Sequence, residues 1–119
     1  NIRWIEADLE PDPDSVLPLG PYALIVLIRY VHRGILPALT RRLVPGGLLI
    51  VEEHLDSDAA VIGPSNPAFR LRPNELLRSA LEAARGSDID IRYYREGLVT
   101  DPDGRRAALA QLVAASTSG

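Results

Sequence analysis

The stretch that decides the fold is residues 22–54, YALIVLIRYVHRGILPALTRRLVPGGLLIVEEH. Its first seven residues, 22–28, form an apolar run rich in β-branched side chains, which predicts a strand buried on both faces. Residues 33–43 follow with leucine and isoleucine at helical spacing, and the proline and two glycines at 45–47 end that helix. Residues 48–54 predict a second buried strand that ends in charge. Strand, helix and strand with short links form a βαβ unit, so we expect parallel strands with a right-handed crossover.

The segments on either side of this unit differ in regularity. Residues 2–7 predict a short strand, and a loop with four prolines follows at 8–21. Residues 55–72 show little periodicity, and a loop of that length is typically a lid or a binding segment.

A helix and a hairpin are predicted at the C-terminal end. Residues 73–86 begin with proline and close with Gly86, and their apolar face is formed by Leu77, Leu81 and Ala84. Residues 88–97 alternate as a strand does, and the DPDG turn at 101–104 leads into an alanine-rich segment, 106–116. That segment has a helical alternative, but its alternation and the turn favour a hairpin. The fold class is therefore an α/β sheet of parallel strands plus a C-terminal antiparallel hairpin.

The composition limits the class of protein. The 119 residues suffice for one domain, and 46% of them are hydrophobic, which is enough for a packed core. The longest fully apolar run, at 23–28, is far shorter than the roughly 18 residues that a membrane helix needs. There is no cysteine, which excludes disulfides, a thiolate nucleophile and a cysteine metal site, and which suits a cytoplasmic protein.

The charges exclude further classes. All 13 basic residues are arginine and lie scattered among 16 acidic residues, for a net charge of −3. No basic stripe results, so we expect no nucleic-acid partner. We expect no membrane partner either, because the apolar runs are too short to span a membrane. Without lysine, the chain cannot supply a phosphate-loop lysine or a Schiff-base lysine.

Several short motifs, taken together in their order along the chain, resemble the C-terminal half of a class I S-adenosylmethionine-dependent methyltransferase. Residues 43–54, LVPGGLLIVEEH, resemble that family's L-K-P-G-G turn and fifth strand, with Val44 in place of lysine. Residues 22–33 resemble the fourth strand, with Ala23 where the family commonly has aspartate. IEADLE, residues 5–10, resembles the third strand and its terminal acid. The helix at 73–86 and the hairpin are similar to the family's fifth helix and closing strands, and the small tellurite-resistance or thiopurine-type enzymes are the nearest subgroup.

The resemblance also identifies a missing part. The family holds the methionine part of its cofactor on a glycine-rich loop after the first strand, and no G-x-G-x-G occurs in this chain. Residues 1–119 are thus expected to form a single partial methyltransferase domain, a fragment with a partial Rossmann-like sheet. The implied activity is methyl transfer from S-adenosylmethionine to a small-molecule acceptor, by in-line attack on the sulfonium methyl.

The resemblance implies five cofactor-binding residues. The Asp8 carboxylate would accept a hydrogen bond from the adenine amino group, and the Leu9 backbone N–H would meet a ring nitrogen. Ile28, Arg29 and Tyr30 leave the buried strand at its carboxyl end, where they would contact the methionine part and the methyl donor. The alternatives are a loop acid that caps a turn at Asp8, a half-buried aromatic at Tyr30 and a solvated strand end at Arg29.

Tyr30 and His32 are the candidate catalytic residues. A histidine titrates near neutral pH and could deprotonate an acceptor, while Arg33 could bind an anionic group of the substrate. The alternative, which a lone histidine favours, is the first turn of a helix that faces water.

Two further clusters have a functional and a structural interpretation. The five titratable side chains of Glu52, Glu53, His54, Asp56 and Asp58 suggest a metal site, but a solvated rim is favoured, and we assign no metal. Phe69, Arg70 and Arg72 lie where the family places its acceptor-binding segment, and loop packing is the alternative.

Two other functions remain open. The chain could be a non-catalytic α/β module that packs on a partner, or on a second copy as a homodimer, through an exposed sheet edge. A nicotinamide-dependent oxidoreductase half is the weaker alternative, because no dinucleotide fingerprint is present.

Overall fold

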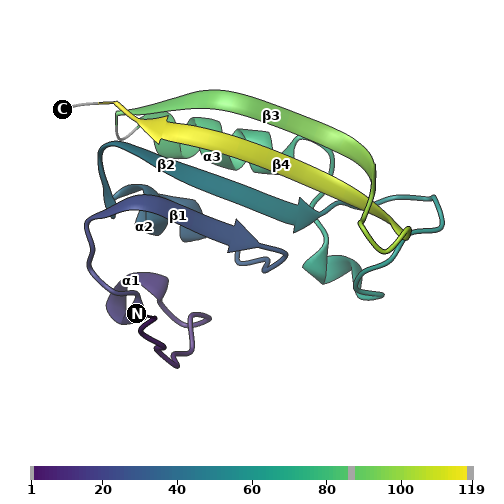
Figure 1. Cartoon of the computed structure of the whole chain (residues 1–119), viewed down its shortest axis with the longest axis horizontal. Coiled ribbons are helices and arrows are strands. Elements are labelled where there is room, and N and C mark those ends of the chain that lie inside the picture. Colours follow the sequence, from purple (N-terminus) through teal and green to yellow (C-terminus); the bar gives the residue numbers. More distant parts are fainter. Residues whose placement is uncertain (1, 86–87, 118–119) are drawn as a thin grey trace.

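The computed structural model describes residues 2–85 and 88–117 (Figure 1). A four-stranded sheet has the order β1-β2-β4-β3, and helices lie behind it. The strands are β1 (Tyr22–Ile28), β2 (Leu43–His54), β3 (Ile89–Thr100) and β4 (Arg106–Ser116). The helices are α1 (Pro13–Val16), α2 (Ile35–Thr40), α3 (Glu75–Arg85) and a 3-10 turn, η1 (Pro67–Phe69). None of the described helices is long and apolar enough to cross a membrane.

The pairing of the strands confirms the predicted fold class. β1 and β2 run parallel, with α2 between them in the chain, and Leu27 lies opposite Val51. β3 and β4 form an antiparallel hairpin, and β4 also pairs antiparallel with β2. The helical alternative for residues 106–116 is therefore wrong, because their backbone groups pair with strands on both sides.

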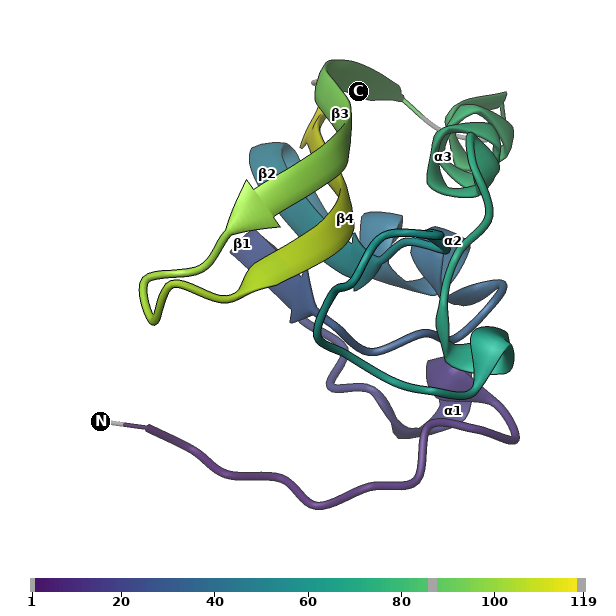
Figure 2. The ribbon, with the colours of Figure 1, turned by 90° about the vertical axis from the view of Figure 1, so that its right-hand side faces the viewer.

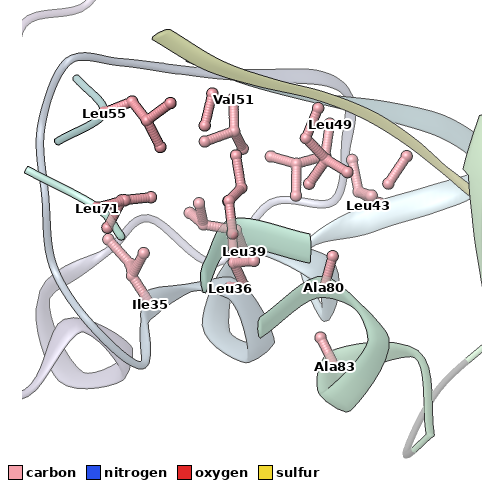
Figure 3. Packing of buried hydrophobic residues seen from close by; sticks show 14 of the residues in the cluster. Ile35, Leu36, Leu39, Leu43, Leu49, Val51, Leu55, Leu71, Ala80 and Ala83 are labelled. Carbon is pink, nitrogen blue, oxygen red and sulfur yellow. The ribbon is translucent and has the colours of Figure 1, made fainter. Parts of the chain in front are cut away.

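The core lies between the sheet and helices α2 and α3 (Figure 3). Leu49 and Val51 of β2 and Leu112 of β4 are each 1% exposed. Helices α2 and α3 contribute further residues to this cluster: Ile35, Leu36, Leu39, Leu76, Ala80 and Ala83. The buried stripe of α3 is thus shifted by one position from the predicted Leu77, Leu81 and Ala84, and the predicted end at Gly86 lies outside the described residues.

The opposite face of the sheet corrects the prediction that β1 is buried on both faces. Leu24, Val26 and Ile28 are 55%, 51% and 50% exposed, whereas Ile25 and Leu27 pack against the core. Figure 2 shows α2 and α3 on one side of the sheet, with no described helix on the other. On the described chain, one face of this apolar strand therefore lies in the core and the other is exposed.

The N-terminal segment corrects a second prediction. Residues 2–7 form no strand, and the side chains of Ile2 and Trp4 are 79% and 88% exposed. A strand needs a neighbour to receive its backbone hydrogen bonds, and within the described chain this segment has none. Figure 2 shows it running below the sheet as an extended trace.

The links around α2 differ in detail from the predicted bounds. The helix ends at Thr40 instead of residue 43, because Leu43 already pairs with Tyr22 as the first residue of β2. The register then shifts between Tyr22 and Leu24, where the proline–glycine turn forms a bulge. A Cβ at Gly47 would lie 2.9 Å from the Val44 carbonyl oxygen, so this close approach requires glycine.

Candidate active site

A cleft of about 430 Å³ lies at the carboxyl ends of the parallel strands β1 and β2. Its lining comes from the N-terminal segment, from the end of β1, from the end of β2 and from the long loop. The lining residues are Glu10, Arg29, Tyr30, Val31, His54, Gly63, Pro64 and Phe69. This edge is where open α/β sheets bind ligands, and the volume falls within the roughly 300–1,000 Å³ of small-molecule sites.

Glu10 and Tyr30 form one wall of the cleft. The Tyr30 hydroxyl donates to the Glu10 carboxylate at 2.7 Å, and this bond raises the pKa of Tyr30 to about 12. Tyr30 therefore stays protonated near neutral pH and acts as a donor. His32 lies behind this wall, with its Nε2 atom 3.2 Å from the Glu10 carbonyl oxygen, and it is not among the lining residues. Both predicted catalytic residues thus contact Glu10, but only Tyr30 lines the cleft.

His54 is the titratable base that lines the cleft from β2. It is 8% exposed, and its Nδ1 atom has no hydrogen-bond partner within the described residues. Burial lowers its pKa, and the positive charges of Arg29 and Arg70 lower it further. A neutral imidazole at physiological pH can accept a proton, so His54 has the protonation state of a general base. In the sequence, the position of His54 at the end of an apolar strand indicated a functional site. The neighbouring acidic residues instead favoured the interpretation of this segment as a solvated loop rim.

The opposite wall belongs to the long loop at 55–72, which arginine side chains hold in place. Arg70 donates to the carbonyl oxygens of Leu55, Ile62 and Pro64 at 2.9–3.2 Å. The loop returns beside β2, where the Leu71 backbone N–H donates to the His54 carbonyl oxygen at 2.8 Å. This leaves Phe69 54% exposed at the cleft, so Phe69 is available to a ligand while Arg70 has a structural role.

Arg33 fixes the same loop from the turn after β1. Its guanidinium pairs with the Glu75 carboxylate at 2.6 Å and donates to the carbonyl oxygens of Ala68 and Arg70. Glu75 in turn accepts from the Arg72 backbone N–H at 2.9 Å. The sequence analysis considered Arg33 as a cation that could bind the substrate. Its hydrogen-bond donors are instead occupied by the residues before α3 and by Glu75 in its first turn.

Arg29 joins three elements at the mouth of the cleft. Its guanidinium donates to the Glu52 carboxylate at 3.0 Å and to both carboxylate oxygens of Asp101 at 3.0 and 3.2 Å. Gln111 donates to the other oxygen of Glu52, at 2.9 Å. The backbone of Arg29 is left-handed, with φ of 55°, and such a conformation persists only where the surroundings hold it. Arg29 is therefore a structural clamp between β1, β2 and the β3–β4 turn.

Replacing Arg29 with methionine is expected to destabilise the protein by about 1–2 kcal/mol, because two partly buried carboxylates then lose their shared cation. Urea unfolding measures the change. The matched control is Arg92→Met, whose ion pair with Asp90 is 3.6 Å long and more than half exposed; it should change stability by less than about 0.5 kcal/mol. Equal effects of the two substitutions would contradict the clamp.

The remaining predicted cofactor residues lie apart from one another. The Asp8 carboxylate accepts from the Glu10 backbone N–H at 3.1 Å in an exposed turn, and Leu9 packs against the core. Ile28 lines a shallow hollow on the uncovered face of the sheet. Of the five, only Arg29 and Tyr30 line the cleft, and the binding roles of Asp8, Leu9 and Ile28 stay predictions.

The sequence predicted a cluster of acidic side chains at the end of β2. Because side chains alternate between the two faces of a strand, neighbouring members of this cluster lie on opposite sides of the sheet. Glu52 faces the uncovered side of the sheet, while Glu53 is 4% exposed and faces the helices. Within residues 2–85 and 88–117, no group of three or more histidine, aspartate or glutamate side chains is placed to hold a metal ion.

Three solved structures share this fold over most of the chain. TehB from Haemophilus influenzae matches with a TM-score of 0.58 and 21% identity, over 90% of this chain and 39% of that one. A SAM-dependent methyltransferase from Methanosarcina mazei matches with 0.59 and 12%, over 89% and 65%. The [4+2]-cyclase SpnF matches with 0.58 and 15%, over 87% and 52%. No family model and no curated protein matches the sequence.

The chain has the fold of the S-adenosylmethionine-dependent methyltransferases. This confirms the resemblance drawn from the motifs, at the level of fold. The chain spans between 39% and 65% of the length of these structures, so the activity of a whole enzyme is a matter of proposal. A cyclase with the same fold illustrates that function resides in the site.

Proposed function

We propose that this chain is the C-terminal part of an S-adenosylmethionine-dependent methyltransferase that acts on a small-molecule acceptor. The observation that carries the proposal is the cleft at the carboxyl ends of β1 and β2, in a fold shared with such enzymes, with the neutral base His54 in its lining. The general kind of enzyme rests on the fold, and the acceptor class rests on the size of the cleft.

The cleft residues fit one side of the cofactor. S-adenosylmethionine would bring an electrophilic methyl group on a positively charged sulfur. Glu10 offers a carboxylate, and the rings of Tyr30 and Phe69 offer aromatic surface, and both kinds of group attract a cation. Asp8 and Leu9 remain the proposed adenine contacts. The glycine-rich loop that would hold the methionine part is not in this sequence.

Few side chains need to act chemically, because methyl transfer depends on alignment more than on acid–base steps. His54 would accept the proton that an acceptor hydroxyl, amine or thiol releases. Tyr30, which holds its proton, would orient the acceptor or the cofactor as a hydrogen-bond donor. Phe69 and Pro64 would exclude water from the loop side.

The non-catalytic module remains a second candidate because of the uncovered face of the sheet. Leu24, Val26, Ile28, Leu48 and Tyr93 are between 39% and 55% exposed on the described chain. In the sheet order, β1 also has a free edge. In the methyltransferase proposal the remainder of the domain covers this face and pairs with this edge; in the alternative, a partner or a second copy does so.

The coding sequence ahead of Asn1 gives the first test. We expect it to hold about 100 residues with a strand, a glycine-rich turn and a second strand that ends in an acid. An upstream sequence without these elements would contradict the methyltransferase proposal.

Calorimetry with S-adenosylhomocysteine gives the second test, on the 119-residue chain and on its full gene product. We expect the gene product to bind with a Kd of roughly 10–100 μM, about −5.5 to −7 kcal/mol. Micromolar binding by the 119-residue chain would exclude the non-catalytic module. No binding by the gene product at millimolar ligand would overturn the proposal.

Substitution of the two histidines separates their roles in that gene product. His54→Gln is expected to leave binding of S-adenosylhomocysteine within a few-fold and to lower kcat by roughly 10²-fold or more, the usual loss for a general base. His32→Gln, which removes the histidine outside the cleft, is the matched control with a smaller effect. The reverse order would assign the base to His32.

A further inference from the structure

A second, smaller cavity lies on the helix side of the sheet, between the turn after β1, the end of β2 and helix α3. Its volume is about 30 Å³, and it is lined by both His32 and Glu53, with Ser79 on the α3 side. A cavity needs roughly 10–15 Å³ to hold one water molecule, so this one has room for a water and for no larger ligand.

Two polar atoms at this cavity have no partner within the described residues. Glu53, at 4% exposure, leaves Oε1 unpaired, and His32 leaves Nδ1 unpaired. An unpaired buried polar atom costs about 1–3 kcal/mol, so native proteins rarely leave such an atom without a partner. Because both atoms lie at the same small cavity, one bound molecule that forms a hydrogen bond with each of them accounts for both.

We propose that this cavity is a binding site for a single water molecule that joins Glu53 Oε1 to His32 Nδ1. The proposal stands apart from the methyltransferase function, since it concerns only the ligand of this cavity.

The donor and acceptor pattern suits a water. His32 Nε2 lies against the Glu10 carbonyl oxygen, which only accepts, so the neutral ring carries its proton on Nε2 and offers Nδ1 as an acceptor. Burial raises the pKa of Glu53 to about 8, so at neutral pH this carboxyl group is mostly protonated and Oε1 can donate. A water accepts from Glu53, donates to His32, and retains one O–H for the Ser79 hydroxyl.

The other charged groups around the pair are engaged or face away. Glu52, next to Glu53 on β2, is bonded to Arg29 and Gln111 and raises the pKa of Glu53 by its charge. Arg33 lines the cavity, but its guanidinium is paired with Glu75 of α3. The Tyr30 backbone N–H donates to the Glu53 carboxylate and favours its anion. Within the described residues, Glu53 Oε1 and His32 Nδ1 therefore have no partner other than the proposed water.

A crystal structure of this protein at high resolution gives the first test. One ordered water within hydrogen-bond distance of both Glu53 Oε1 and His32 Nδ1 is the expected result. A direct bond between the two side chains, a rotated His32 ring or a cavity without electron density would overturn the proposal.

Two substitutions at position 53 test the site in solution. In the wild-type protein, the NMR signal of the Glu53 side-chain carboxyl carbon is expected to change with pH well above the range of an exposed glutamate, because burial raises the pKa of Glu53. Glu53→Gln should retain the water and abolish this titration, while Glu53→Leu should lose the water as well. A Glu53 carboxyl group that titrates as an exposed glutamate does, or a water retained in the leucine variant, would contradict the site.

Discussion

Replacing Glu53 with glutamine is expected to flatten the dependence of stability on pH above about pH 5. In the folded protein, burial raises the pKa of Glu53 to about 8 from its ordinary 4.5. Between these values the folded state keeps a proton that the unfolded state releases, so the contribution of Glu53 is complete below the lower pKa and is lost as the pH rises through the upper one. At about 1.36 kcal/mol per pKa unit, the whole loss is about 5 kcal/mol, most of it between about pH 5 and pH 8.5.

Glutamine keeps the shape of the side chain and the acceptor for the Tyr30 backbone N–H, and it carries no charge to desolvate. The variant should therefore gain about 4 kcal/mol over the wild-type protein when both are taken from about pH 5 to about pH 8.5. Urea unfolding at several pH values measures the difference. The control is Glu82→Gln on the exposed side of α3, which should leave the wild-type slope unchanged. Parallel slopes for the Glu53 variant and the wild type would show that Glu53 ionises in the folded state as freely as in the unfolded chain.

The sequence predicted the elements whose signal is local. The apolar run at 22–28, the turn and strand at 43–54 and the DPDG hairpin all have patterns that short stretches define. The strand predicted at 2–7 failed because a strand depends on a neighbour, which no pattern within six residues can supply. The burial predicted for both faces of β1 failed for the same reason, since burial depends on what packs against the strand.

The location of the candidate site could be predicted from the sequence, but not all of the residues that form it. The carboxyl ends of the parallel strands could be read from the topology, and Arg29 and Tyr30 line the cleft there. The loop wall could not be predicted, because Arg70 holds it by bonds to backbone carbonyls, which any residue type offers. Glu53 shows a signal that was available, since period-2 alternation separates it from Glu52 and directs it into the core.

Substituting alanine for Gly63 is the most direct test of how His54 is placed in the cleft. The backbone φ of Gly63 is 119°, a conformation that strains any residue with a Cβ. The added Cβ would lie 2.7 Å from His54 Nδ1, 2.8 Å from His54 Cε1 and 3.0 Å from Arg70 Nη2. The imidazole or the loop must therefore move. We expect a loss of about 3 kcal/mol, from backbone strain and displaced packing together.

The matched control is Gly104→Ala in the β3–β4 turn. Gly104 has a φ of 85°, and a Cβ there would meet no atom within 4 Å, so only the backbone strain remains, about 1–2 kcal/mol. Urea unfolding gives the difference between the two variants, and the NMR signals of the His54 ring report its displacement, which we expect only for Gly63→Ala. Equal losses with an unmoved His54 would mean that the loop yields without disturbing the ring. If S-adenosylhomocysteine binds in this cleft, its affinity should fall with the Gly63 substitution and not with the Gly104 substitution. Of these two glycines, Gly63 lines the cleft and Gly104 does not.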